Sequence, residues 1–168
     1  MSDSATQDRF VVLVDEHRKI LYKVASAYCR EPADRADLEQ EIVAQLWRSF
    51  SRYDARYRFS TWMYRIALNV AISYVRGESR RRRTLVPAEE SILQVAADDA
   101  GHEPDERLPM LRAFIQQLGE LDRALIILYL DDHRYDAIAE IVGISESNVG
   151  TRISRIKQRL RRELTQPA

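Results

Sequence analysis

The sequence predicts an all-α protein: two small helical domains joined by a flexible acidic linker, with a helix-turn-helix in the second domain. Glycine and proline number only 5 each among 168 residues, and long stretches carry apolar residues every three or four positions, as amphipathic helices do. Residues 84–107 lose that period and hold seven acidic side chains against Arg107 alone. Near the C-terminus, Gly143 separates a short apolar segment from a long basic one, which is the layout of a helix-turn-helix.

Three amphipathic segments are expected to enclose the core of the first domain, residues 1–83. Pro32 interrupts the pattern after the first of them, because proline lacks the amide hydrogen that a helix interior needs. Ser60 is a good residue to cap the third segment. Residues 51–58 before it, SRYDARYR, have no helical period and are expected to form a loop. The expected helices cover residues 7–28, 34–50 and 60–80.

Shorter helices are expected in the second domain, residues 105–168, which follows a linker at residues 84–104. Gly119 breaks the apolar pattern, and residues 131–134 read as a polar turn. Several short helices can bury their apolar faces against one another and so share one core. The expected helices cover residues 105–118, 121–130, 135–142 and 146–164.

The last two of these helices are suited to duplex DNA. Gly143 would end the first helix, and Ser145 would cap the second through its hydroxyl. The residues expected to pack between the two helices are Ile138, Ala139, Val142, Val149, Ile153 and Ile156. The opposite face would present short polar groups and then guanidiniums, which suit base edges and phosphates in the major groove. These groups belong to Ser147, Asn148, Thr151, Arg152 and Arg155. A solvated basic face on an ordinary helical hairpin remains the alternative.

A second basic element lies between Tyr53 and Arg83, where aromatic residues are interleaved with arginines. The formal net charge is zero, but segment 76–83, RGESRRRR, holds five arginines, and such local patches set the field that a polyanion meets. Aromatic rings stack on unpaired bases while arginines follow the phosphates, so this element is a candidate site for single-stranded DNA. Trp62 and Tyr74 could equally belong to the core.

Several classes of protein are excluded by composition. No apolar run is long enough to span a bilayer, and the N-terminal stretch MSDSATQDRF lacks the basic and apolar regions of a secretory signal. The single cysteine excludes an internal disulfide, and the three scattered histidines give no zinc cluster. We therefore expect a cytoplasmic protein with no membrane insertion, no cofactor and no metal site.

Four stretches together resemble the extracytoplasmic-function (ECF) sigma factors of bacterial RNA polymerase. "DLEQEIVAQLW" (residues 37–47) is similar to the family's polymerase-binding helix, and "YDARYRFSTWMYRIALNVAISYVR" (residues 53–76) is similar to its promoter-melting segment. "YDAIAEIVGIS" and "NVGTRISRIKQRLRREL" are similar to its C-terminal helix-turn-helix. Ser73, Gly77, Ala137 and Gly150 depart from the family pattern, and these departures concern promoter choice more than function.

The resemblance implies a dissociable specificity subunit with no catalytic residues. Its implied partners are core RNA polymerase, through the β′ clamp helices and the β flap, promoter DNA in duplex and single-stranded form, and an anti-sigma factor. The acidic linker would thread the RNA exit path of the polymerase. The residues implied to dock on polymerase are Asp37, Leu38, Gln40, Glu41, Leu46 and Trp47. Leu38 and Leu46 share an apolar stripe with Ile42, so some of this set are expected in the core.

The resemblance also divides the DNA contacts between the two domains. The first domain would open the −10 promoter element and hold a flipped base. Its implied residues are Tyr53, Tyr57, Phe59, Arg65, Asn69, Arg76 and Arg80. The second domain would read the −35 element with the polar face of its last helix, given above.

Two other classes of function were weighed. A free-standing helix-turn-helix regulator would account for residues 105–164 but would leave the segment "DLEQEIVAQLW" and the aromatic loop without a role. An enzyme is disfavoured because no Ser-His-Asp grouping, phosphate loop or metal cluster can be recognised. The zero net charge and the two-domain layout further suggest that the free protein holds its domains together, with both DNA faces hidden.

Overall fold

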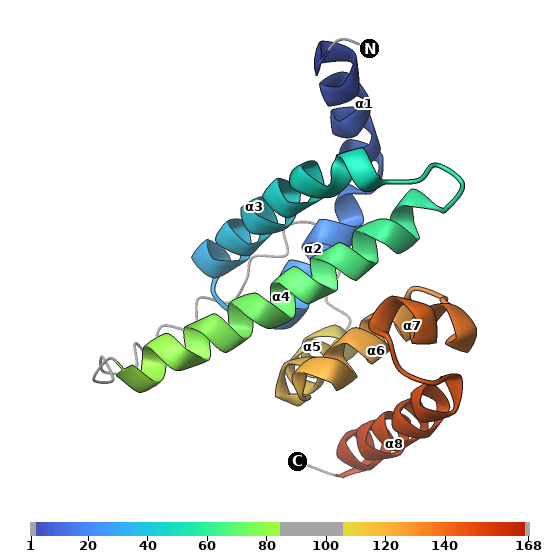
Figure 1. Cartoon of the computed structure of the whole chain (residues 1–168). Helices are drawn as coiled ribbons and strands as arrows, with labels where there is room; N and C mark the ends of the chain where they lie inside the picture. Colours follow the sequence, from blue (N-terminus) through green and yellow to red (C-terminus); the bar gives the residue numbers. More distant parts are fainter. Residues whose placement is uncertain (1–2, 85–105, 167–168) are drawn as a thin grey trace.

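The computed structural model describes residues 3–84 and 106–166, with the side chains of residues 78–84 left out. All regular structure in these ranges is helical (Figure 1). The prediction of an all-α chain with two helical domains is confirmed. The expected acidic linker lies almost wholly outside the described residues. The helices are α1 (Asp3–Glu16), α2 (Arg18–Tyr28), α3 (Pro32–Ser49), the 3-10 turn η1 (Phe50–Arg52), α4 (Phe59–Thr84), α5 (Arg107–Gln117), α6 (Glu120–Leu130), α7 (Tyr135–Val142) and α8 (Glu146–Thr165).

The N-terminal domain is built around α2, α3 and the long helix α4, which pack against one another (Figure 1). Leu38, Ile42 and Leu46 follow each other at four-residue spacing on α3 and are fully buried. They meet apolar side chains of the other two helices, including Val24 and Met63. Burial of each such side chain contributes about 1.5–3 kcal/mol, so this stripe fixes which face of α3 remains outside.

The predicted single helix over residues 7–28 is wrong, because the chain breaks at His17. This residue has φ −110° and ψ 21°, and its amide nitrogen lies 3.3 Å from the Leu13 oxygen and 3.2 Å from the Val14 oxygen. Its ring nitrogen Nδ1 lies 2.9 Å from the same Leu13 oxygen, and its ring packs on Phe59 at 5.0 Å between centroids. The apolar pattern of the sequence continues through residue 17 and gives no sign that the helix ends there. The contact of His17 with Phe59 of α4 is visible only in the folded chain.

The start of α4 also differs from the prediction. Ser60 lies inside the first turn, and the helix begins at Phe59, with the amide of Trp62 donating to the Arg58 oxygen at 3.2 Å. Ser60 is therefore not the capping residue. Phe59 is the first residue of α4, and its ring is buried among other aromatic rings.

The helix-turn-helix is confirmed in α7 and α8. Gly143 has the left-handed φ of 83° that ends α7, and the Ser145 hydroxyl accepts a 3.1 Å hydrogen bond from the amide of Asn148 at the start of α8. Ile138, Val149 and Ile153 have no exposed surface, as expected. Ala139 and Val142 are only half-buried, whereas Ile141, which was not among the residues expected between the two helices, is buried.

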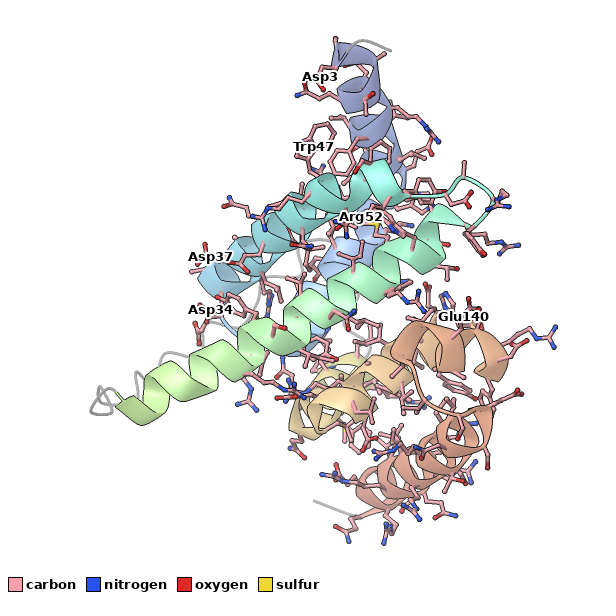
Figure 2. All side chains as sticks on the ribbon, in the orientation of Figure 1. Asp3, Asp34, Asp37, Trp47, Arg52 and Glu140 are labelled. Carbon is pink, nitrogen blue, oxygen red and sulfur yellow. The ribbon has the colours of Figure 1, made fainter. Side chains whose placement is uncertain are left out.

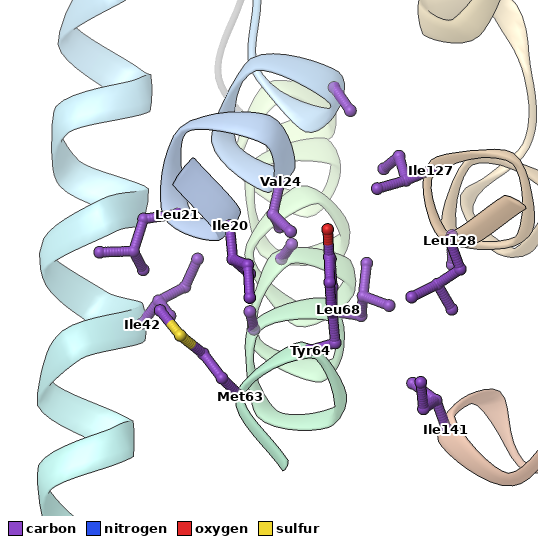
Figure 3. Packing of buried hydrophobic residues seen from close by; sticks show 14 of the residues in the cluster. Ile20, Leu21, Val24, Ile42, Met63, Tyr64, Leu68, Ile127, Leu128 and Ile141 are labelled. Atoms are coloured by element: carbon purple, nitrogen blue, oxygen red, sulfur yellow. The ribbon is translucent and has the colours of Figure 1, made fainter. Parts of the chain in front are cut away.

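The two domains pack directly against each other. Tyr64 and Leu68 of α4 face Ile127 and Leu128 of α6, and Ile141 of α7 lies beside them (Figure 3). Their side chains belong to one continuous apolar cluster that also includes α2 and α3. The expectation that the domains are held together is met in this structure.

Candidate polymerase and nucleic-acid interfaces

The outer face of α3 is polar and open. Asp37, Gln40 and Glu41 are exposed, and Trp47 near the end of the helix keeps 42 % of its surface exposed (Figure 2). Leu38 and Leu46, from the same sequence motif, point into the core with no exposed surface. The face that α3 offers to a partner therefore consists of the three polar residues and the tryptophan.

Trp47 is held in place from beneath by other rings. Its ring lies 5.0 Å from that of Phe10 on α1 and 6.4 Å from that of Phe50 in η1, between centroids. A large ring that is half open and fixed on one side suits an interface, because it loses little conformational freedom on binding. The break at His17 lets α1 bring Phe10 to this position.

An aromatic cluster supports the loop that precedes α4. Phe59, 5 % exposed, lies 5.4 Å from both Tyr53 and Trp62, and Tyr53 lies 5.0 Å from Trp62. The Tyr53 hydroxyl donates a 2.8 Å hydrogen bond to the backbone oxygen of Tyr57, whose own ring is 62 % exposed. The cluster thus holds Phe59 inside while the loop presents Tyr57 to solvent. Half-buried Trp62 agrees with the alternative that it packs in the core.

An ion pair stiffens the same loop. The Asp54 carboxylate accepts hydrogen bonds from Arg56 Nε at 2.9 Å, Arg56 Nη2 at 2.7 Å and the Arg56 amide at 3.0 Å. The side-chain hydrogen bonds from Arg56 lower the pKa of Asp54 below its ordinary value. These hydrogen bonds and the one from Tyr53 to Tyr57 all lie within residues 53–57 of the loop.

The predicted −10 residues on α4 share one helix face, but two of them already have partners in the C-terminal domain. Arg65 donates from Nη2 to the backbone oxygen of Glu140 at 2.9 Å, and Arg76 pairs through Nε with Glu120 Oε2 at 2.8 Å. Asn69 lies between them and is exposed. The side chain of Arg80 lies outside the described residues. The C-terminal domain therefore contacts two side chains of this α4 face, but the face is not buried.

Asp131 joins the two domains and was not identified from the sequence. One carboxylate oxygen accepts a 2.7 Å hydrogen bond from the Tyr64 hydroxyl, and the other lies 2.6 Å from Lys23 Nζ. The Tyr64 ring also packs edge-on against His133 at 5.2 Å. Burial, followed by the hydrogen bond to Asp131, raises the pKa of Tyr64. Burial alone would raise the pKa of Asp131, but the hydrogen bonds from Lys23 and Tyr64 outweigh it and lower that pKa.

The polar face of α8 is open. Ser147, Asn148, Thr151 and Arg155 are exposed, and the Thr151 hydroxyl donates to the Ser147 oxygen at 3.0 Å. Arg152 is half-buried, with Nη1 3.0 Å from Asp122 Oδ1 at the start of α6. The expectation that domain packing hides both DNA faces is therefore wrong, because the face on α8 is open and the described residues on the α4 face stay exposed although two of them contact the C-terminal domain.

Metal-binding clusters and membrane-spanning helices are both absent from the described part of the chain. Among the described side chains, those of residues 3–77 and 106–166, no three His, Cys, Asp or Glu come together in a way that could hold a metal ion. In the same ranges, no helix has both the length and the apolar character needed to cross a membrane.

Comparison with known families divides the chain in the same way as the fold. The model of sigma-70 region 2 matches residues 13–81, and that of sigma-70 region 4 matches residues 108–160. The first match runs from the end of α1 through α2, α3 and the aromatic loop to most of α4. The second covers nearly all of α5, then α6, α7 and most of α8. Together the two matches span well over half of the chain.

Individual relatives agree with these matches. The chain is 29 % identical to the ECF RNA polymerase sigma factor SigW of Bacillus subtilis, over 94 % of this chain and 90 % of that protein. It is 30 % identical to the ECF RNA polymerase sigma factor SigE of Mycolicibacterium smegmatis, over 95 % of this chain and 63 % of the longer relative. In fold it is similar to the sigma factor RpoE of Bartonella quintana, solved in complex with the anti-sigma factor NepR. That likeness has a TM-score of 0.70 at 18 % identity and covers 96 % and 98 % of the two chains.

Proposed function

Because the chain belongs to the extracytoplasmic-function sigma factors of bacterial RNA polymerase, we propose that it directs core polymerase to promoters and helps to open the DNA. The observation that carries this proposal is that both sigma regions occur in order, each with an exposed polar helix face. We place polymerase docking and the −10 element in residues 1–83 and the −35 element in residues 105–168, with residues 84–104 as linker. The protein would act in the cytoplasm, where polymerase is.

The proposed polymerase contacts lie on α3. Asp37, Gln40, Glu41 and Trp47 would meet the β′ clamp helices, since their side chains are open on one helix face. Leu38 and Leu46 would act indirectly, because they anchor α3 in the core and so orient that face. A rigid helix that presents a few polar groups around a fixed aromatic anchor is a common design of specific interfaces.

The β flap would bind the C-terminal domain at an apolar cavity of about 190 Å³ between α5 and α8. Phe114 and Leu160 form part of its lining, and Met110 and Leu164 at its edge are both about half exposed. Exposed apolar side chains around a hollow are typical of a docking site for a partner helix.

The −10 element would be opened by the aromatic loop and α4. Tyr57 offers an open ring for stacking on an unpaired base, while Tyr53 and Phe59 shape the loop that carries it. Arg65, Asn69, Arg76 and Arg80 would follow the DNA strand. Arg65 and Arg76 bind the C-terminal domain in this structure, so the domains would have to separate before both arginines reach DNA.

The −35 element would be read in the major groove by α8. Ser147, Asn148 and Thr151 lie near the start of the helix, where base edges are usually contacted. Arg152 and Arg155 follow one turn later and can reach guanine edges or phosphates. We further propose that a separate anti-sigma factor holds the protein inactive, as the complex of the solved relative with NepR suggests.

Reversing the charge at Glu41 tests the docking face. We expect Glu41→Lys to weaken binding to purified core polymerase by tenfold or more, about 1.4 kcal/mol, because a charge of the wrong sign at a complementary interface is costly. Titration of labelled protein with core polymerase gives the affinity. Asp8→Lys, which reverses an exposed carboxylate on α1, is the matched control and should bind normally. If the wild-type protein bound promoter DNA but not polymerase, the free-standing regulator would be the better account.

A further inference from the structure

The ion pair between α6 and α8 sits at the edge of the proposed reading face. Arg152 follows Asn148 by four residues and precedes Arg155 by three, so the three side chains share one face of α8. Its Nη1 donates to Asp122 Oδ1 at 3.0 Å, with side chains 38 % and 31 % exposed. Asp122 lies in the first turn of α6, and nothing in the proposed function gives it a role.

We propose that Asp122 is a positioning residue that fixes Arg152 for recognition of one base pair of the −35 element. This inference rests on the proposed function. A guanidinium has five N–H donors in a fixed plane, and Asp122 occupies Nη1 alone. The remaining donors stay available for the two acceptors of a guanine edge, O6 and N7, which arginine contacts in a bidentate manner.

Fixing the side chain matters because a free arginine has many rotamers. Ordering a long side chain at the moment of binding costs conformational entropy, and a pair already formed in the free protein removes part of that cost. The pair also restricts the plane of the guanidinium. A base pair whose acceptors do not lie in that plane is therefore bound more weakly than it would be by a free arginine. Asp122 would thus contribute to specificity without touching the DNA.

The charge of Asp122 distinguishes a role in base specificity from a contribution to overall DNA affinity. A carboxylate beside the DNA repels the phosphates, so Asp122 lowers the affinity for any duplex, whatever its sequence. Its benefit can come only through Arg152. The alternative role is structural: an acidic residue in the first turn favours α6 through the helix dipole. In that case its loss would weaken binding to all sequences together, through instability of the domain.

The test uses the full-length protein and a promoter duplex in which each −35 base pair is varied in turn, with a scrambled duplex as the non-specific reference. Asp122→Asn removes the charge and keeps the shape. We expect it to reduce discrimination at one base pair by about tenfold, at the same position where Arg152→Ala loses discrimination. Binding to the scrambled duplex should be unchanged or tighter. Combined with Arg152→Ala, the substitution should have no further effect on discrimination at that position.

A matched control exists on the same helix. Arg159 and Glu163 form a pair at 3.3 Å with side chains 44 % and 42 % exposed, so Glu163→Gln breaks an ion pair of similar exposure that lies within α8, away from the proposed base contacts. It should leave base preference unchanged. Asp122→Glu, which keeps the charge, should restore part of the lost discrimination.

Three results would overturn the proposal. The first is an unaltered base preference in Asp122→Asn, the second is an equal weakening of specific and scrambled binding, and the third is a loss of discrimination in Glu163→Gln like that in Asp122→Asn. A wild-type protein that does not distinguish the promoter from the scrambled duplex would instead contradict the proposed function itself, and this inference with it.

Discussion

Replacing Asp131 with alanine is expected to open the packed domains. The substitution removes the acceptor for the Tyr64 hydroxyl, which belongs to a residue with no exposed surface. An unsatisfied buried hydroxyl costs about 1–3 kcal/mol, enough to shift a balance between closed and open forms by roughly 5- to 150-fold. The pair with Lys23 adds little, because it is well exposed. Small-angle X-ray scattering should show a larger radius of gyration.

Matched variants identify the cause of the opening. Tyr64→Phe removes the hydroxyl together with the hydrogen bond, so no buried donor is left unsatisfied, and it should open the domains less than Asp131→Ala. Lys19→Ala, which changes an exposed residue of α2, should not open them. Both opened variants should also bind −10 DNA more readily, because Arg65 and Arg76 lose their partners. Full helicity with an unchanged radius in Asp131→Ala would show that the hydrogen bond does not hold the domains together.

The same contact gives the domain packing a dependence on pH. The pKa of Asp131 is lowered in the folded protein, so its stabilising effect is complete above the ordinary aspartate pKa of about 3.9. The effect is lost as the pH falls through the lowered value. The pKa of Tyr64 is raised by burial, so its hydroxyl keeps its proton throughout this range. Asp131→Ala should therefore lack part of the acid-induced opening of the wild type.

Replacing Phe59 with alanine is expected to destabilise the N-terminal domain by about 3–5 kcal/mol. Its ring lies within 5.4 Å of His17, Tyr53 and Trp62 and is almost completely buried. Loss of the ring leaves a cavity under the loop at residues 53–58 and removes a contact that supports the break at His17. Urea denaturation followed by tryptophan fluorescence would measure the loss.

Tyr57→Ala provides the opposite case in the same loop. Because the Tyr57 ring is 62 % exposed, its removal should change stability by no more than about 0.5 kcal/mol. If Tyr57 stacks on an unpaired base, this variant should nevertheless open promoter DNA poorly, as judged by permanganate footprinting with core polymerase. A Phe59→Ala protein as stable as the wild type would contradict the role of Phe59 in supporting the loop. Normal promoter opening by Tyr57→Ala would contradict the role of Tyr57 in contacting DNA.

Local patterns were enough to predict much of the fold. The bounds of α7 match the prediction, and the turn at Gly143 and the cap at Ser145 are confirmed, because each depends on neighbouring residues. The break at His17 was not predicted, because the apolar pattern continues through it and the ring that packs on His17, that of Phe59, lies far along the chain. The hydrogen bond between Tyr64 and Asp131 likewise joins residues that no local period connects.

The candidate sites were predicted less completely than the fold. Consecutive residues of a helix point to all of its sides. A contiguous sequence motif therefore includes buried positions as well as exposed ones. Leu38, Leu46 and Phe59 are therefore buried within otherwise open sets. The family supports the prediction of a transcription initiation factor that is not an enzyme. The polymerase and DNA roles of individual residues remain predictions.

The most direct test of the account is to map transcription start sites with core RNA polymerase, with and without this protein, on DNA from its own upstream region. We predict new, discrete starts that require both components, preceded by shared −10 and −35 sequences. Those sequences would define the base pairs that α4, the aromatic loop and α8 contact. Binding of the protein to this DNA without any new start would contradict a role as a sigma factor.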